Sequence, residues 1–224
     1  MGILIAIEGL DGSGKGTQTK RICERLKAKQ LPFKTVSFPN YDSPAASLVK
    51  MYLNGDFGTH PQDVNAYAAS SFYAVDRYAS YRTDWEKNYR CGDIIVCNRY
   101  TTSNLFHQMV KLPKEEWNAF SEWLSDFEYE RLGLPKPDAV LYFDMDPDIS
   151  QELLAGRYRG DEQKKDIHER DLSYLRACRE TALYAAEKFG WNVIHCFSEN
   201  KPLSVEDIET DAIRVLENRL KISL

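Results

Sequence analysis

The chain has 224 residues, with 29 Lys and Arg against 34 Asp and Glu, and therefore a formal net charge of −5. This length predicts one domain, residues 1–224, that buries a core without disulfides, and 43% hydrophobic residues exclude a disordered chain. The negative charge argues against a general binder of nucleic acids or anionic membranes, because such proteins need a broad basic face.

The distribution of charges, the cysteines and the N-terminus indicate which ligand and which compartment to expect. Residues 1–112 carry 14 Lys and Arg against 10 Asp and Glu, a net of +4, whereas residues 113–224 carry 15 against 24, a net of −9. We interpret the basic first half as a hint of a small bound anion. Scattered cysteines without a C-x-x-C pair predict reduced thiols. The start lacks the basic region of a signal peptide, and no apolar run is long enough to span a bilayer, so we expect a cytoplasmic protein.

The first predicted strand, Ile3–Glu8, leads into the strongest motif of the chain. Gly9-Leu10-Asp11-Gly12-Ser13-Gly14-Lys15 matches G-x-x-x-x-G-K and opens a predicted amphipathic helix, Gly14–Lys29. In this context the glycines let backbone N–H groups surround phosphate oxygens, the helix N-terminus adds partial positive charge, and the lysine reaches the β- and γ-phosphates. We predict an ATP site at Gly9, Leu10, Asp11, Gly12, Ser13, Gly14, Lys15, Gly16 and Thr17.

The magnesium ligand of this loop departs from the usual pattern. The residue after Lys15 is normally a Ser or Thr that binds the ion, but here it is Gly16, followed by Thr17. We therefore expect magnesium to be held by Thr17, through water, or by a carboxylate such as Asp11.

The next predicted strands are Phe33–Phe38 and Asp93–Cys97. The second of them delivers Asn98, Arg99 and Tyr100 to the carboxyl edge of the sheet, where ligands bind in open α/β sheets. Arg99 could clamp a phosphate there in a bidentate manner. Taken alone, an arginine at a strand end is better explained by a surface ion pair.

The second half continues the alternation of helix and strand. Trp117, Phe120, Leu124 and Phe127 recur at spacings of three, four and three, which predicts an amphipathic helix. Its apolar face belongs to the core or to an interface, and we favour the core. The predicted strands Ala139–Asp144 and Trp191–Cys196 follow, and Ser204–Asp207 resembles a capping box ahead of a last helix. Runs such as AVLYFD do not alternate, which is typical of strands buried on both faces. The pattern predicts an α/β fold with a five-stranded parallel sheet flanked by helices.

One charged segment separates the last two strands. Gly156–Asp171 reads GRYRGDEQKKDIHERD and is nearly free of apolar residues. It is consistent with a solvated loop, and equally with a lid whose cations close over a charged ligand.

Together these motifs resemble the thymidylate kinase family along nearly the whole chain. EGLDGSGKGTQ resembles its E-G-x-D-G-x-G-K-x-T loop, SFPNYDSPAASLVKMYLNG its F-P segment, FYAVDRY its F-A-x-D-R, and NRYTTSN its D-R-Y-x-x-S-N. PDAVLYFDM, followed by the charged segment, is the last of these motifs, and all of them occur in the order of the family. The resemblance implies a P-loop nucleoside monophosphate kinase fold with a short charged LID at about residues 156–171.

The resemblance also implies the reaction. Members transfer the γ-phosphoryl group of ATP to dTMP, giving dTDP for dTTP biosynthesis, with Mg²⁺ and as homodimers. It implies an aromatic stack of Tyr73 on thymine, contact of Arg77 with the base or the phosphate, contact of Asn104 with the base, and contact of Arg99 with the acceptor phosphate. The implied acceptor-binding residues are Asp11, Phe38, Pro39, Tyr73, Arg77, Arg99, Asn104, His107 and Gln108, and the implied catalytic residues are Lys15, Arg99, Arg157 and Arg159. Arginines in the LID and none in the P-loop resemble the bacterial type of the family.

Several positions depart from the family pattern. Gly16 is one, Asn98 stands where Asp is usual, and Asn40 or Tyr41 stands where many members have Arg. His107 stands where a Tyr often lies near the sugar. These changes bear on metal dependence, rate and sugar discrimination rather than on fold.

Two alternatives remain at this point. The sequence GKGTQ also matches adenylate kinases, so a kinase for another nucleoside monophosphate is one alternative. The other is a nucleotide-binding regulatory protein that has lost catalysis, as Gly16 and Asn98 suggest.

Overall fold

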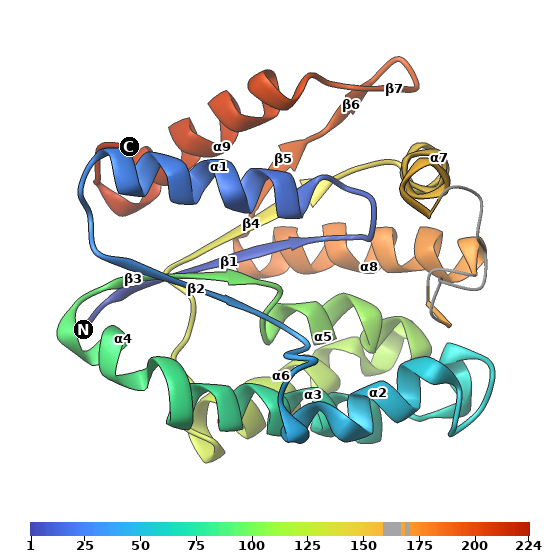
Figure 1. The fold of residues 1–224 in the computed structure, drawn as a ribbon. Coiled ribbons are helices and arrows are strands. Elements are labelled where there is room, and N and C mark those ends of the chain that lie inside the picture. The colour runs from blue at the N-terminus through green and yellow to red at the C-terminus, as the bar shows by residue number, and fades with distance from the viewer. Residues whose placement is uncertain (159–166, 169–170) are drawn as a thin grey trace.

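The protein is described by a computed structural model that covers residues 1–158, 167–168 and 171–224 (Figure 1). A five-stranded sheet with the strand order β2-β3-β1-β4-β5 forms its centre. The strands are β1 (Ile3–Gly9), β2 (Phe33–Ser37), β3 (Ile94–Asn98), β4 (Ala139–Asp144) and β5 (Asn192–His195). All pairs are parallel, and each predicted strand is confirmed, with ends that differ by at most one residue.

The central strand β1 pairs with β3 on one side and with β4 on the other. Its odd-numbered apolar residues Ile5 and Ile7 enter one core, and Leu4 and Ala6 enter another on the opposite face. Every residue of β4 is buried. Full burial of one such aliphatic side chain stabilises the fold by about 1.5–3 kcal/mol, so these runs favour the centre of a covered sheet.

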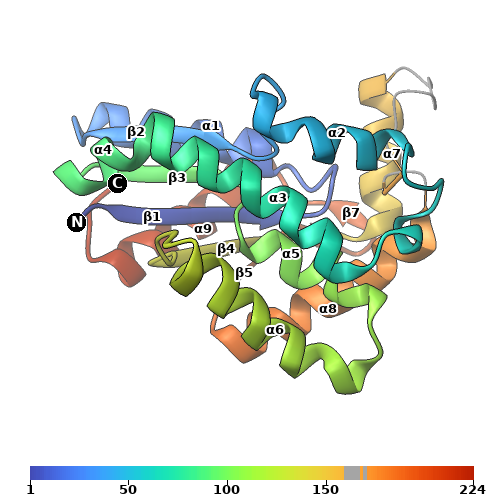
Figure 2. The same cartoon turned by 90° about the horizontal axis from the view of Figure 1, so that it is seen from below.

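Helices cover both faces of the sheet (Figures 1 and 2). They are α1 (Lys15–Ala28), α2 (Ser47–Asn54), α3 (Ala66–Ser80), α4 (Glu86–Cys91), α5 (Thr102–His107), α6 (Trp117–Ser125), α7 (Pro147–Tyr158), α8 (Leu172–Phe189) and α9 (Val205–Leu220). Helices α1 and α9 pack on the face of Ile5 and Ile7, whereas α4, α5 and α8 pack on the opposite face. The predicted α/β architecture is thus confirmed.

Two helices widen into π-helical turns at their C-terminal ends. Tyr81–Trp85 follows α3, and Asp126–Arg131 follows α6. On α6, Phe120 and Leu124 are buried and Trp117 packs half-buried against them, so this part of the face is core, whereas Phe127 is half-buried. The predicted amphipathic stripe extends past Ser125 into the second π turn, a change of register that the spacing did not predict.

The remaining elements are short. Pro44–Ala46, Pro61–Asp63, Met109–Lys111 and Lys114–Glu116 form 3₁₀ turns, and β6 (Phe197–Ser198) pairs with β7 (Lys201–Pro202) in an antiparallel hairpin that was not predicted. The predicted cap of the last helix is confirmed, because the Ser204 hydroxyl accepts the Asp207 N–H at 3.0 Å. Within the described ranges, no helix is both long enough and apolar enough to cross a membrane.

Candidate functional site

The loop between β1 and α1 has the geometry of a phosphate cradle. Gly12 and Gly14 have φ values of 80° and 83°, in the left-handed region that favours glycine. A Cβ at Gly12 would lie 2.6 Å from the backbone oxygen of Ser150, so this position requires glycine for space as well as for conformation. The glycines of the motif therefore shape the loop, as predicted.

Lys15 is the first residue of α1 and is buried. Its ammonium group donates hydrogen bonds to the Leu10 carbonyl at 3.2 Å and to Asp11 Oδ1 at 2.9 Å. Burial, followed by the charge of Arg99, lowers the pKa of Lys15, while Asp11 opposes the shift. The lysine is thus folded back onto the loop, within reach of an anion that enters it.

A cavity of about 630 Å³ opens at this loop. Asp11, Gly12, Ser13, Gly14, Lys15, Gly16 and Thr17 all line it, together with Asn98 and Arg99 from the end of β3. The two remaining predicted ATP-site residues lie behind it: Gly9 ends β1, and the Leu10 side chain packs in the core beside Phe106 and Tyr142. We call this space the donor cavity.

The turn after β3 holds Arg99 in an unusual backbone conformation, with φ of 64°. Its guanidinium donates through Nη2 to Asp11 Oδ1 at 2.9 Å and through Nη1 to His107 Nε2 at 3.1 Å. Beneath the turn lies the buried carboxylate of Glu8, which accepts the Tyr100 N–H at 2.9 Å and the hydroxyls of Thr102 at 2.6 Å and Ser103 at 2.5 Å. Glu8 therefore fixes the segment that presents Arg99 at the carboxyl edge.

The charges around Arg99 set the ionisation of its neighbours. Burial acts to raise the pKa of Asp11, but the charges of Arg99 and Lys15 hold that pKa well below its usual range. Burial, and then Arg99, hold the pKa of His107 well below its usual value. An arginine N–H can only donate, so Nε2 of a neutral His107 is the acceptor. The surface ion pair considered for Arg99 is instead a pair with Asp11 inside the site.

A second cavity of about 260 Å³ adjoins the first. Its lining includes all of the predicted acceptor-binding residues, which are Asp11, Phe38, Pro39, Tyr73, Arg77, Arg99, Asn104, His107 and Gln108. Tyr41, Tyr100, Ser103 and His168 also line it. We call it the acceptor cavity. Asp11 and Arg99 line both cavities, so the two spaces meet at this ion pair.

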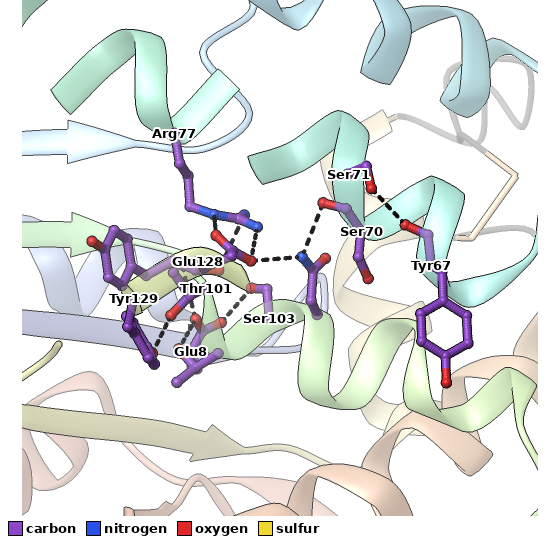
Figure 3. A network of polar contacts seen from close by, with 12 residues as sticks. Glu8, Tyr67, Ser70, Ser71, Arg77, Thr101, Ser103, Glu128 and Tyr129 are labelled. Atoms are coloured by element: carbon purple, nitrogen blue, oxygen red, sulfur yellow. Dashed lines mark hydrogen bonds and ion pairs between the residues drawn. The ribbon is translucent and has the colours of Figure 1, made fainter. Parts of the chain in front are cut away.

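One end of the acceptor cavity rests on a buried polar network (Figure 3). Arg77 donates to the carboxylate of Glu128 through Nε at 2.7 Å and through Nη2 at 2.6 Å. Asn104 donates its amide to the same carboxylate at 3.1 Å. Gln108 is completely buried, and neither of its side-chain polar atoms has a partner among the described residues. Unpartnered buried amides are rare, so Gln108 is available to a ligand.

His168 also lines the acceptor cavity, although it is remote in sequence from the other lining residues. Its Nε2 lies 2.8 Å from the Tyr52 hydroxyl, which also accepts a hydrogen bond from Lys111 at 2.9 Å. The His168 ring stacks on His107 with centroids 5.4 Å apart. Burial and the charge of Lys111 lower the pKa of His168 to about 3, so the ring is neutral at pH 7.

Oxygen ligands for magnesium are present beside the donor cavity. Asp11 is ionised, Thr17 lines the cavity, and the buried Oδ1 of Asn98 has no partner within the described part of the chain. Mg²⁺ prefers oxygen ligands and usually keeps several waters, so this sparse donor set fits the ion. The described residues contain no group of three or more His, Cys, Asp or Glu placed to hold a metal by themselves.

The predicted LID falls largely outside the described residues. Arg159 lies outside them altogether, and Arg157 belongs to the last turn of α7, with its side chain outside the described part. Their predicted contact with the phosphates stays a prediction.

Sequence reasoning missed three residues of the site. Glu8 carries a signal, because it is a carboxylate at the end of a buried apolar strand. Glu128 lies four residues after Leu124, so it continues the apolar stripe of α6 as a charged residue where burial is expected. His168 carried no signal within the charged segment, because its partners Tyr52 and His107 are remote in sequence.

Glycines shape the loop between the central parallel strand β1 and helix α1, and two cavities meet beside this loop. This combination is typical of a P-loop kinase. The model of the thymidylate kinase family matches residues 7–208. The chain is therefore a member of the thymidylate kinase family.

Individual relatives agree with this assignment. The chain is 31% identical over 185 residues to thymidylate kinase from Mycobacterium tuberculosis, with 82% of this chain and 84% of that protein covered. It is 30% identical over 191 residues to a probable thymidylate kinase from Pyrobaculum aerophilum, with 85% and 86% covered. A solved thymidylate kinase from Candida albicans has a similar fold, with a TM-score of 0.71 over 98% of this chain and 92% of that one, at 22% identity.

Proposed function

We propose that the protein transfers the γ-phosphoryl group of ATP to the 5′-phosphate of dTMP, giving ADP and dTDP for dTTP biosynthesis. One observation carries this proposal: Asp11 and Arg99 line both cavities, so a donor phosphate on the P-loop and an acceptor phosphate at Arg99 would meet there. Transfer between two phosphates requires that positioning above all else.

The residues divide the work between the two cavities. The backbone of residues 11–17 and the ammonium of Lys15 bind the ATP phosphates. Arg99 holds the acceptor phosphate, whose oxygen attacks the γ-phosphorus as the bond to the ADP oxygen breaks. Charge moves onto the leaving oxygen in this step, and fixed cations such as Lys15 and Arg99 stabilise it. The whole chain, residues 1–224, acts as one kinase domain, and Arg157 and Arg159 of the LID add charge at the phosphates.

Magnesium completes the donor side. Asp11, Thr17 and Asn98 supply the oxygens that would hold it, directly or through water. When bound, the ion neutralises phosphate charge that the protein cations leave uncompensated. The amide at Asn98 provides an oxygen ligand without the negative charge of a carboxylate.

The acceptor cavity is suited to a pyrimidine nucleotide. The Tyr73 ring offers a stacking surface, and Arg77, Asn104 and Gln108 offer polar atoms for the base. A flat aromatic surface with a few placed donors and acceptors is what base recognition requires. Phe38, Pro39 and His107 narrow the remaining wall, with His107 beside Arg99 near the expected place of the sugar.

Self-association and location complete the proposal. Leu48 and Met51 on α2, and Tyr67, Val75 and Tyr78 on α3, are exposed apolar residues on two neighbouring helices. We assign this face, named here the α2–α3 face, to a second copy of the chain, because the family resemblance implies a homodimer.

We place the protein in the cytoplasm. The five cysteines are free thiols, which suits a reducing compartment.

Acceptor preference tests this function. With ATP and Mg²⁺, the initial rates for dTMP, dUMP, dGMP, AMP and CMP are compared in an assay coupled to ADP. The proposal predicts the fastest turnover with dTMP. Faster turnover of AMP, CMP or dGMP would contradict it. Lys15→Ala serves as the catalytic control, with a loss of turnover by about two orders of magnitude or more.

A further inference from the structure

The carboxylate of Glu128 contacts both Arg77 and Asn104, the two side chains proposed above to offer polar atoms to the base. It lies on the π turn Asp126–Arg131 and is completely buried. Glu128 Oε2 accepts Arg77 Nε, and Oε1 accepts both Arg77 Nη2 and Asn104 Nδ2, at 2.7, 2.6 and 3.1 Å. Figure 3 shows the Arg77 side chain pointing toward Glu128.

These contacts determine which way the Asn104 amide faces. Its Nδ2 meets two acceptors, the Glu128 carboxylate and the backbone oxygen of Ser70 at 3.4 Å. A carboxylate and a carbonyl oxygen only accept, so the amide nitrogen must face them. The opposite atom, Oδ1, accepts no hydrogen bond from the described residues, and Asn104 lines the acceptor cavity. Glu128 therefore leaves an acceptor at this position.

The same carboxylate determines which N–H donors of Arg77 remain for a ligand in the acceptor cavity. Nε and Nη2 are bound to Glu128, and the one contact of Nη1 with the described residues is long, at 3.4 Å to the Tyr100 carbonyl. Nη1 carries two N–H groups, so a donor remains for the acceptor cavity that Arg77 lines. Burial acts to lower the pKa of Arg77, but Glu128 raises it, and the guanidinium stays charged.

We propose that Glu128 is a positioning residue that fixes the hydrogen-bond polarity of the acceptor cavity, with Arg77 as donor and Asn104 as acceptor. A 4-keto pyrimidine presents the matching edge, an accepting O4 beside a donating N3–H. A 4-amino pyrimidine presents the reverse, a donating amine beside an accepting N3. Glu128 thereby selects 4-keto over 4-amino bases, an inference that rests on the proposed function for the placement of the base.

Glu128→Gln removes this control with almost no change of volume. Glutamine has one side-chain oxygen with two lone pairs, so it cannot accept from Arg77 Nε, Arg77 Nη2 and Asn104 Nδ2 at the same time. Its NH₂ group would also be a donor, which lets Asn104 turn its oxygen toward residue 128 and its nitrogen toward the cavity. Glu128→Asp keeps the charge beside Arg77 but shortens the reach by one methylene, and it serves as the more conservative variant.

The test measures dissociation constants for dUMP and dCMP by titration calorimetry, because the two differ only at this edge of the base. Two mismatched hydrogen bonds predict that the wild-type chain binds dUMP at least about 100-fold more tightly. The ratio should fall below about 10 in Glu128→Gln and take an intermediate value in Glu128→Asp, with ATP affinity unchanged within about twofold. A merely structural role would lower the melting temperature without changing the ratio.

Glu209→Gln is the matched control. Glu209 also accepts from arginines, Arg21 at 2.5 Å and Arg25 at 2.8 Å, but it ties α9 to α1 and lines neither cavity. Its substitution should leave the ratio unchanged. Equal binding of dUMP and dCMP by the wild-type chain, or a wild-type ratio in either folded Glu128 variant, overturns the inference. Selective binding of dUMP without phosphoryl transfer would instead contradict the proposed function and leave the role of Glu128 intact.

Discussion

At the scale of single residues, the charge pattern of the site depends on a few contacts around Arg99. Asp11 and His107 both bind its guanidinium, and Glu8 anchors the turn on which it lies. The planar fork can hold Asp11, His107 and an incoming phosphate at the same time, because its five N–H donors point in fixed directions. A lysine ammonium group, which is a point charge, could not hold these three partners in the same fixed geometry.

Arg99→Lys tests that requirement. Lysine retains the charge but not the fork, so we expect kcat for dTMP to fall by about 100-fold, the usual cost of one transition-state donor. Steady-state kinetics with saturating ATP and Mg²⁺ measures the change. Arg131→Lys, at an exposed arginine paired with Asp126, is the control and should retain wild-type kcat. Near-normal turnover of Arg99→Lys would show that charge alone suffices at residue 99.

His168 makes a prediction about pH and stability. Burial and Lys111 lower its pKa in the folded chain from 6.5 to about 3. The unfolded chain therefore binds this proton more tightly, so stability is fully present above pH 6.5 and is lost as the pH falls toward 3. One such proton corresponds to a slope of about 1.4 kcal/mol per pH unit.

His168→Gln should remove that slope, because glutamine retains a hydrogen bond to the Tyr52 hydroxyl but does not titrate. Urea unfolding at a series of pH values from about 4 to 6 gives the free energy of unfolding for both chains. We expect the wild-type curve to be steeper by about 1.4 kcal/mol per pH unit. Identical slopes would mean that His168 is not a neutral buried group in solution.

At the scale of elements, the loop between β1 and α1 depends on a glycine whose role is steric. Gly12→Ala would place a methyl group 2.6 Å from the backbone oxygen of Ser150 at φ of 80°. The left-handed conformation alone costs about 1–2 kcal/mol, and the clash adds to it. We expect a lower free energy of unfolding and weaker ATP binding, measured by thermal melting and calorimetry.

Gly16→Ala is the matched control for stability. Gly16 lies in the first turn of α1, and a Cβ there would meet no heavy atom of the described residues within 4 Å. Alanine is favoured over glycine in a helix by about 1 kcal/mol, so this variant should be at least as stable as the wild type. A Gly12→Ala chain as stable as Gly16→Ala would remove the steric argument.

The elements also show how far the sequence predicts the structure. The buried strands were predicted correctly, because short apolar runs that do not alternate are typical of strands buried on both faces. The P-loop was predicted from its position between a strand and a helix. The β6–β7 hairpin was missed because each strand has two residues, too short for any periodicity. The π turn of Asp126–Arg131 was missed for a different reason: spacing predicts a stripe but not a widened turn. That turn carries Glu128, so the carboxylate that binds Arg77 and Asn104 was missed with it.

At the scale of the whole molecule, the site joins residues from most of the chain. The net charge of −5 excluded polyanions, yet Lys15, Arg77 and Arg99 all come from the basic first half and surround the two cavities. Family resemblance predicted which residues line the acceptor cavity. The contacts of His168 with Tyr52 and His107 required the fold, because they join positions more than 60 residues apart, as the residue numbers themselves show.

The α2–α3 face gives a prediction about assembly. Val75→Asp combined with Tyr78→Asp places two charges on exposed apolar positions that line neither cavity. If this face joins two copies, the molar mass by light scattering should fall to half that of the wild type. Phe189→Asp, at an exposed aromatic residue of α8, should leave the mass unchanged. A double variant with wild-type mass at the same concentration would place the dimer contact elsewhere.

Transfer from ATP to dTMP is the proposed role of the two cavities that meet at Asp11 and Arg99. Incubation of the purified chain with ATP, Mg²⁺ and dTMP, followed by ³¹P NMR, measures every phosphorus product at once. We expect dTDP and ADP in equal amounts, with no inorganic phosphate formed at a comparable rate. ATP binding without turnover, or ADP and inorganic phosphate without dTDP, would contradict it.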